Sequence, residues 1–364
     1  MAELPSRLQR LADSLSALEV DAFLVTDEIN VRYLSGFTGD SSSLLVSSGQ
    51  ASILSDGRYS AQIQEQCRGI EMRIRSSTQT AQDLISESLQ DSRIRRVALE
   101  AHHMSVAQFQ FFEQGCSGVE LVATTGVIEK LRMIKDESEI ATTRTAVDLA
   151  ERVFREMLPT LSSEHTELEV AHGIEQRLRD LGAEGCSFSP IVGAGPGSAL
   201  PHYQPRNVAL GAHQCLLIDW GAKYQGYASD LTRTLHAPQV GDSFKRAYEG
   251  VLEAQLAAID LIKPGMPVKE VDAAARAALQ RHGILEAFSH GLGHGTGLQI
   301  HEMPRMSPIS DEILAPGMII TVEPGVYYDG DFGIRIEDDV LVTESGHEVL
   351  STLPKGLDDC RFIL

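Results

Sequence analysis

Residues 218–234 read IDWGAKYQGYASDLTRT and predict an antiparallel β-hairpin that carries two aspartates. Asp219 follows a run of apolar residues, and Asp230 lies in a segment rich in β-forming residues. A four-residue loop over 223–226 would place the two aspartates directly opposite each other, with Cβ atoms about 5 Å apart. Like charges in that position destabilise a sheet, so the pattern indicates a cation between them.

A second pair of strands is predicted near the C-terminus, and it carries two glutamates. Glu323 ends one strand and Glu337 lies in the returning one, so the two are expected to face each other across the turn. Arg335 lies two residues before Glu337 and therefore points to the same side. Asp338 points to the other face, and Asp339 is the competing acid in this segment.

The segment HGLGHGTGLQIHE (290–302) carries three histidines among closely spaced glycines. That glycine density excludes a stable helix, so His290 and His294 are not a helical pair of ligands. His301 does not begin a helical zinc motif, because position 305 is arginine. No G-x-G-x-x-G opens a helix after a strand here, so no dinucleotide loop is predicted. Single histidines are more often structural, and that role is assigned to His103, His165, His213, His236, His282 and His347.

One set of side chains indicates two metal ions, and its members are Asp219, Asp230, His294, Glu323 and Glu337. The four carboxylates carry four negative charges, which two divalent cations would neutralise. Buried together without cations, the acids would repel one another and retain protons. Oxygen-rich donors of this kind suit Mn²⁺, Co²⁺ or Zn²⁺. A single acid in a strand is usually a solvated surface residue, but this whole set lies beside apolar runs and favours a metal site.

The composition bounds the class of protein. A chain of 364 residues is long enough for two domains, and 43% hydrophobic with 23% charged residues is typical of a soluble protein. The net charge of −20 argues against nucleic acid or an anionic membrane as a partner. Five scattered cysteines without a C-x-x-C indicate reduced thiols and a cytoplasmic location. The N-terminus has no apolar signal core, so a secreted or anchored form is not expected.

The order of elements predicts two domains of different kinds. Residues 1–127 alternate short strands and helices, which predicts a small α/β domain with a mixed sheet. A linker is expected at 128–135, and Asp136 is expected to cap a helix that ends at Pro159. From 136 to 364, runs of helices alternate with the acidic hairpins, which indicates an α+β domain.

The chain resembles the pita-bread proline-specific metallopeptidases, the Xaa-Pro aminopeptidases and prolidases. The resemblance covers nearly the full length and rests on the ordered motifs IDWGAKYQGYASDLTRT, GHGTGLQIHE, TVEPG and RIEDD. Weaker matches in the first domain and linker are NVRYLSGFTG (30–39), SDGRY (55–59) and LRMIKDESEI (131–140). The resemblance implies an N-terminal creatinase-like α/β domain followed by a C-terminal pita-bread domain.

The resemblance also implies roles for individual residues. It gives two divalent ions, most often Mn²⁺, bound by the five-residue set above, with Asp230 and Glu337 bridging both ions. His202 and His301 match substrate-site histidines, of which His301 contacts the scissile carbonyl. His290 and Arg335 match supporting positions. Metal-free relatives such as creatinases have lost these ligands, and this chain keeps them.

The expected reaction is hydrolysis of the bond between an N-terminal residue and proline in a peptide, by an Xaa-Pro aminopeptidase. Glu323 would move the proton, and His301 with His202 would stabilise the oxyanion. The alternatives are an Xaa-Pro dipeptidase (prolidase), a methionine aminopeptidase-like enzyme, for which the first domain is surplus, and a non-enzymatic pita-bread binding protein. A homodimer is a family expectation.

Overall fold

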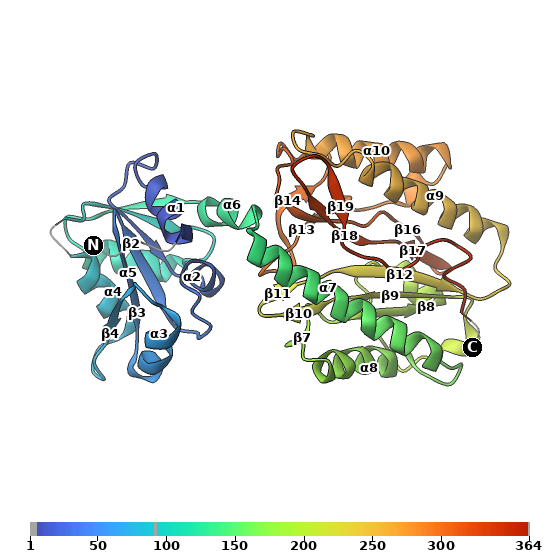
Figure 1. Cartoon of the computed structure of the whole chain (residues 1–364), viewed down its shortest axis with the longest axis horizontal. Coiled ribbons are helices and arrows are strands. Elements are labelled where there is room, and N and C mark those ends of the chain that lie inside the picture. The colour runs from blue at the N-terminus through green and yellow to red at the C-terminus, as the bar shows by residue number, and fades with distance from the viewer. Residues whose placement is uncertain (1–5, 91–92, 363–364) are drawn as a thin grey trace. The chain divides into compact units, whose positions relative to one another are not determined.

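The computed structural model describes residues 6–90 and 93–362, and the chain divides into two compact units between Arg132 and Met133 (Figure 1). Helix α6 (Val127–Met133) occupies most of the segment expected to be a linker. The predicted domain bounds, 1–127 and 136–364 with a linker at 128–135, stay a prediction. None of the helices in the described ranges combines the length and the hydropathy that a bilayer span requires.

The first unit is built on one mixed sheet, as its alternating pattern predicts. The strand order is β4-β3-β2-β1-β5-β6, with β1 antiparallel to β2 and parallel to β5. Its core is the apolar side chains of these strands and of the helices that cover them. The strands are β1 (Ala22–Val25), β2 (Ser43–Ser47), β3 (Gln50–Ser55), β4 (Glu71–Ile74), β5 (Arg96–Glu100) and β6 (Glu120–Thr124).

Short helices connect the strands of the first unit. Helix α1 (Ser6–Ser14) precedes β1, and β1 is followed by helix α2 (Glu28–Ser35). Asp27 caps it, and Gly36 ends it with a φ of 76°. The other helices are α3 (Ser60–Gln66), α4 (Ala81–Leu89) and α5 (Val106–Gly115).

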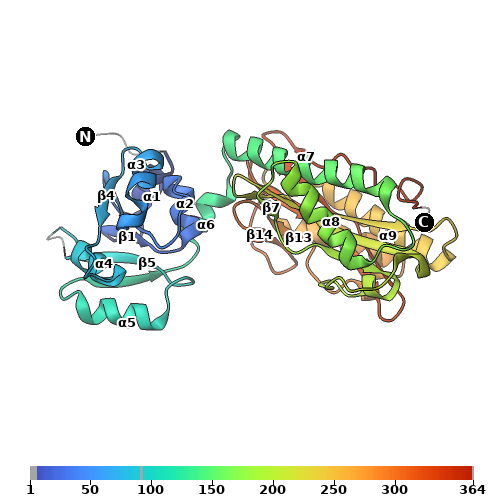
Figure 2. The same ribbon diagram turned by 90° about the horizontal axis from the view of Figure 1, so that it is seen from below.

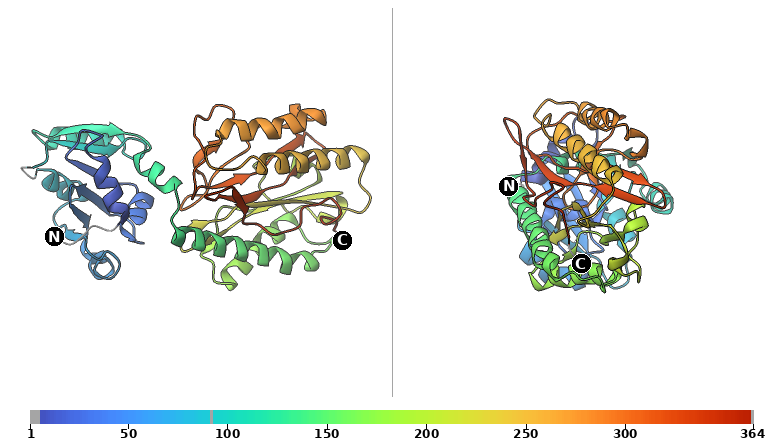
Figure 3. Two further views of the ribbon diagram at one scale, coloured as in Figure 1. Left: turned by 45° about the horizontal axis from the view of Figure 1, so that its top comes forward. Right: turned by 90° about the vertical axis from the view of Figure 1, so that its right-hand side faces the viewer.

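Four helices enclose the strands of the second unit. Helices α7 (Glu137–Met157) and α8 (Glu167–Asp180) lie on one side, and α9 (Asp242–Ile259) and α10 (Val268–Arg281) lie on the other (Figures 1 and 3). Figure 2 shows α7 and α8 in front of the strands. Asp136 caps α7 by accepting from two backbone amides, which confirms the predicted helix start. The chain thus wraps the strands between two helical layers.

The strands between these layers form several small sheets. Strands β12-β9-β8 form one, β11-β10-β7 a second, β14-β13-β15-β18-β19 a third, and β16-β17 a fourth. They are β7 (Gly185–Cys186), β8 (Ile191–Ala194), β9 (Cys215–Trp220), β10 (Ala222–Tyr224), β11 (Tyr227–Ala228), β12 (Leu231–His236), β13 (Gly293–Gly295), β14 (Glu302–Met306), β15 (Ile319–Val322), β16 (Gly325–Tyr328), β17 (Phe332–Arg335), β18 (Asp338–Val342) and β19 (His347–Val349).

The predicted register of the aspartate hairpin is wrong. Tyr224 pairs with Tyr227, so the turn is only two residues long. Both of its residues have positive φ, 46° at Gln225 and 86° at Gly226, which is the turn type that matches the twist of a hairpin. Asp219 therefore pairs with Thr232. Asp230 lies two residues before Thr232, so the two aspartates are diagonal neighbours instead of directly opposite.

The predicted facing of the two glutamates agrees with the register. Val322 pairs with Asp338 in one ladder, and Gly325 pairs with Arg335 in the next. The same register continued between the two ladders places Glu323 opposite Glu337. Neither glutamate belongs to a strand, because each ladder ends beside it.

Candidate metal centre and active site

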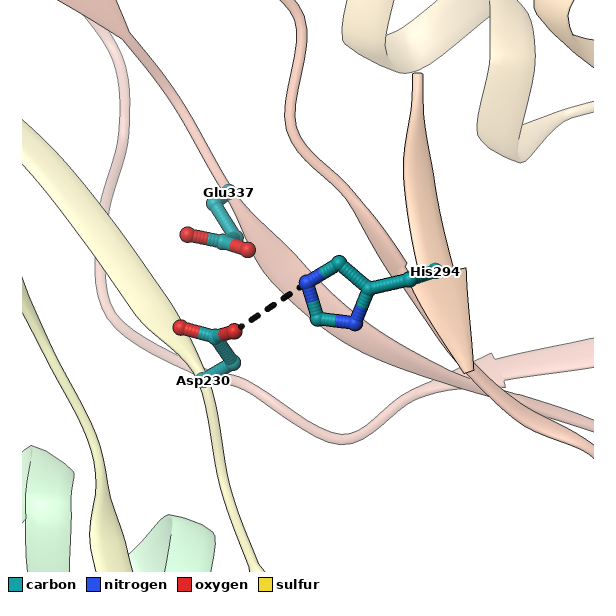
Figure 4. A group of neighbouring side chains, drawn as sticks. All are labelled: Asp230, His294 and Glu337. Carbon is teal, nitrogen blue, oxygen red and sulfur yellow. Dashed lines mark ion pairs between the residues drawn. The ribbon is translucent and has the colours of Figure 1, made fainter. Parts of the chain in front are cut away.

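The second unit brings the five candidate ligands together from separate elements. Figure 4 shows Asp230, His294 and Glu337 pointing toward one another. One donor atom from each lies within 4.8 Å of the others. The five side chains are carried by β9 (Asp219), the residue before β12 (Asp230), β13 (His294), the residue after β15 (Glu323) and the residue before β18 (Glu337).

Two glycines allow the histidine strand to enter this cluster. A Cβ on Gly293 would lie 2.3 Å from the carbonyl oxygen of Thr321. A Cβ on Gly295 would lie 2.0 Å from the carbonyl oxygen of Met303. The segment is not helical, as expected, and its glycines serve the close approach of neighbouring backbone. His294 is thereby held between β14 and β15.

His294 presents a lone pair to the carboxylates. Its Nδ1 lies 3.1 Å from the carbonyl oxygen of Gly295, and a carbonyl can only accept, so Nδ1 carries the hydrogen. Its Nε2 lies 3.3 Å from Glu323 and 3.5 Å from Asp230. Burial, and then repulsion from His301, lower the pKa of His294 to about 4. The ring is therefore neutral near pH 7 and suited to bind a metal through Nε2.

The carboxylates are buried enough to resist ionisation. Burial raises the pKa of Glu323 to about 7, and it raises the pKa of Asp219 as well. Burial, followed by repulsion from Glu337, raises the pKa of Asp230 well above its usual value. Burial, followed by repulsion from Glu323, does the same to the pKa of Glu337. A divalent cation between these groups would remove the cause of the shifts.

A hydrogen-bonded chain supports the cluster from one side. Arg335, 3% exposed, forms an ion pair with Asp219. Its Nη1 donates to the hydroxyl of Tyr327 at 2.8 Å, which lies 3.0 Å from Nε2 of His290. Its Nε donates to Thr232 at 3.1 Å, and Thr232 donates to Glu337 at 2.5 Å. Arg335 and His290 were predicted as supporting residues, whereas Tyr327 and Thr232 were missed.

One carboxylate oxygen marks where a cation would fit. Asp219 Oδ1 is buried and has no hydrogen-bond partner within the described residues. Together with the donors of Asp230, His294 and Glu337, it forms an oxygen-rich set with one imidazole, which fits Mn²⁺, Co²⁺ or Zn²⁺. The competing acid, Asp339, also has one buried oxygen, Oδ1, without a hydrogen-bond partner within the described residues. Its Oδ2 accepts the backbone N–H of Asp230 at 2.9 Å and fixes that segment.

The two predicted substrate histidines lie on loops at this site. The ring of His301 lies 4.4 Å from that of His294, edge to face. Burial, and then repulsion from His202, lower the pKa of His301. His202 is exposed in the segment after Ala199. Both residues are thus exposed to a ligand, while His290 is half-buried.

The chain belongs to metallopeptidase family M24, whose sequence pattern matches residues 141–344. Residues 7–134 match the creatinase/prolidase N-terminal domain. Together the two matches confirm the expected fold class, a creatinase-like α/β domain followed by a pita-bread domain.

Individual relatives agree over nearly the whole length. The peptidase YqhT of Bacillus subtilis is 36% identical over 96% of this chain and 99% of its own. A solved Xaa-Pro dipeptidase from Bacillus anthracis superposes with a TM-score of 0.92 at 35% identity, over 96% of this chain and 98% of that one. An X-Pro aminopeptidase from Thermotoga maritima gives 0.88 at 34% identity, over 99% and 100%.

Proposed function

We propose that this metallopeptidase is an Xaa-Pro aminopeptidase, which hydrolyses the bond between an N-terminal residue and proline. The observation that carries the proposal is the buried cluster of Asp230, His294 and Glu337, whose donor atoms lie within 4.8 Å of one another. The bond before proline is a tertiary amide without an N–H, which general peptidases handle poorly.

In this proposal, Asp219, Asp230, His294, Glu323 and Glu337 hold two divalent ions, with Mn²⁺ expected and Co²⁺ or Zn²⁺ as alternatives. Bound there, the ions would lower the pKa of a shared water and polarise the substrate carbonyl. Asp230 and Glu337 would each contribute ligand oxygens to this centre.

The chain's own side chains then move the proton and bind the peptide. Glu323 accepts a proton from the attacking water and passes it to the proline nitrogen as the bond breaks. His301 and His202 donate to the carbonyl oxygen as it gains negative charge. The free amine of the substrate lies beside Asp219, which restricts cleavage to the first residue. Arg335 and His290 hold these groups in place through Tyr327.

The second candidate is an Xaa-Pro dipeptidase, which would accept only two residues. It is favoured by the superposition on the Bacillus anthracis Xaa-Pro dipeptidase, which is closer than that on the Thermotoga maritima X-Pro aminopeptidase. A cytoplasmic location and a homodimer remain predictions.

A peptide panel tests the proposal. The purified protein is stripped of metal, loaded with Mn²⁺, and assayed on Xaa-Pro, Xaa-Pro-Xaa and Xaa-Ala-Xaa peptides, with Asp230→Asn as the inactive control. Cleavage of Xaa-Pro-Xaa after the first residue supports the aminopeptidase, and cleavage of Xaa-Pro alone supports the dipeptidase. Equal cleavage of the alanine peptide would contradict proline specificity. Full turnover by Asp230→Asn would contradict the ligand assignment.

A further inference from the structure

Lys135 and Glu302 form an ion pair that is almost completely buried. The Nζ of Lys135 lies 3.2 Å from Oε2 of Glu302, and the two side chains are 1% and 5% exposed. Lys135 stands just before α7, where its backbone N–H donates to the carbonyl of Gly317 at 2.9 Å. A buried ion pair is weak evidence for stability but holds two segments in one arrangement, since separating the charges is costly.

Glu302 also contacts the loop that precedes it, residues 297–301. Its Oε1 accepts the backbone N–H of Gln299 at 2.9 Å. A Cβ on Gly297 would lie 2.7 Å from the Glu302 carboxylate, so the carboxylate packs directly on the loop backbone. The carbonyl of Gly297 in turn accepts the N–H of Ala228 at 2.8 Å, two residues before Asp230. The loop is therefore tied both to Glu302 and to the segment that carries Asp230.

His301 ends this loop, directly before Glu302 at the start of β14. His301 is exposed and lies outside any strand, but its ring centroid is 4.4 Å from that of His294. We infer that Glu302, anchored by Lys135, is a positioning residue that holds His301 against the metal centre. The inference rests on the proposed function, in which His301 acts on the substrate carbonyl.

Hydrogen exchange at the Gln299 amide tests the contact independently of activity. In Glu302→Gln, that amide should exchange at least about tenfold faster, because a charge-assisted acceptor is lost. The matched control is Glu151→Gln, which removes another buried carboxylate that accepts backbone amides, those of Thr352 and Leu353. Gln299 should exchange at the wild-type rate in this control. Unchanged exchange in Glu302→Gln would overturn the inference.

Kinetics then test whether Glu302 acts through His301. We expect Glu302→Gln to bind metal normally but to lower kcat about 10- to 100-fold. In the His301→Ala background, the same substitution should cause no further loss, because the group being positioned is gone. If the two losses of kcat multiply in the double variant, Glu302 acts through another group and the inference is overturned. Should Glu302→Gln not fold, Glu302→Asp retains the charge, shortens the side chain, and is expected to show the same non-additivity.

The two proposals fail in different ways. Wild-type kcat in His301→Ala would refute the role given to His301 in the proposed function, whatever Glu302 does. A large loss in His301→Ala with wild-type kcat in Glu302→Gln would refute only the positioning role.

Discussion

The metal-free protein should lose stability as the pH rises from 6.5 to 8, because buried carboxylates must then give up protons. Burial raises the pKa of Glu323 to about 7 and the pKa of Asp339 to about 8. In the unfolded chain both groups are already ionised at pH 6.5. The native state therefore binds more protons than the unfolded state in this window, and the free energy of unfolding falls as the pH rises.

The magnitude follows from the two pKa values. Across this window Glu323 contributes a loss of about 1 kcal/mol and Asp339 about 2 kcal/mol. His290 and His294 oppose it, because burial lowers the pKa of each to about 4. In the unfolded chain both histidines still release protons above pH 6.5. Together they therefore raise the free energy of unfolding by about 1 kcal/mol across the window. The net loss of unfolding free energy from these four groups is about 2 kcal/mol. Asp230 and Glu337, whose pKa values are raised well above the usual range, add to this loss with the same sign.

The protein is first dialysed against a chelator and then unfolded with urea at pH 6.5 and at pH 8. Tryptophan fluorescence monitors the unfolding. Trp220 is the only tryptophan of the chain. It is fully buried and stacks on Phe154 with ring centroids 4.7 Å apart, so its emission reports the unfolding of the second unit. The variant Glu323→Gln should show a pH dependence smaller by about 1 kcal/mol. The exposed Glu348→Gln serves as the matched control and should behave like the wild type.

Adding Mn²⁺ should remove the Glu323 contribution, because a bound cation holds that carboxylate ionised at both pH values. A metal concentration of 100 times Kd should also add about 2.7 kcal/mol. A metal-free protein whose stability is constant or rises between pH 6.5 and 8 would refute the reasoning. The same holds if Glu323→Gln leaves the slope unchanged.

Three further predictions follow from single contacts. Asp230→Asn should fold but retain little metal, as measured by elemental analysis after dialysis against Mn²⁺; wild-type metal content would contradict its role as a ligand. Arg233→Met should lower the free energy of unfolding by about 1.5–3 kcal/mol, because Asp338 loses the guanidinium 2.7 Å away and keeps only Lys355 as a cationic partner; a loss below about 1 kcal/mol in urea unfolding would refute this. Gly226→Ala should cost about 1 kcal/mol by the same assay, because its φ is 86°, and a stabilised variant would show that the turn adopts another conformation.

Most of the fold could be predicted from periodicity and turn signals. The mixed sheet of the first unit and the start of α7 at Asp136 followed from the order of elements and from one cap. The hairpin register could not be predicted, because Gln225 adopts a positive φ that non-glycine residues seldom take. A difference of two residues in turn length moved the pairing partner of Asp219 from Asp230 to Thr232.

That the candidate ligands lie close together was predictable because acids beside apolar runs are rare, whereas the residues that hydrogen-bond to them carry no such signal. Thr232 and Thr321 are ordinary strand residues in the sequence. Each lies two positions from a candidate ligand, and such residues share a face. Thr321 accepts the N–H of His294 at 3.0 Å and donates to Glu323 at 3.3 Å. The ion pair between Glu302 and Lys135 joins residues that are distant in sequence, which no local pattern shows.

The buried cations of the second unit are distributed so that part of the candidate metal centre has no cationic side chain paired with it. Arg335 pairs with Asp219, Arg233 with Asp338 and Lys135 with Glu302. Within the described residues, no lysine or arginine forms an ion pair with the remaining acids of the cluster, Asp230, Glu323 and Glu337.

A buried carboxylate is tolerated only when it is paired or protonated, so these three acids depend on cations from solution or on protons. The same arrangement implies opposite effects for one substitution. Glu323→Gln should stabilise the metal-free protein at pH 8 and abolish the activity of the metal-loaded protein. The reason is that the carboxylates whose mutual repulsion destabilises the metal-free fold are the same groups that are proposed to bind the metal.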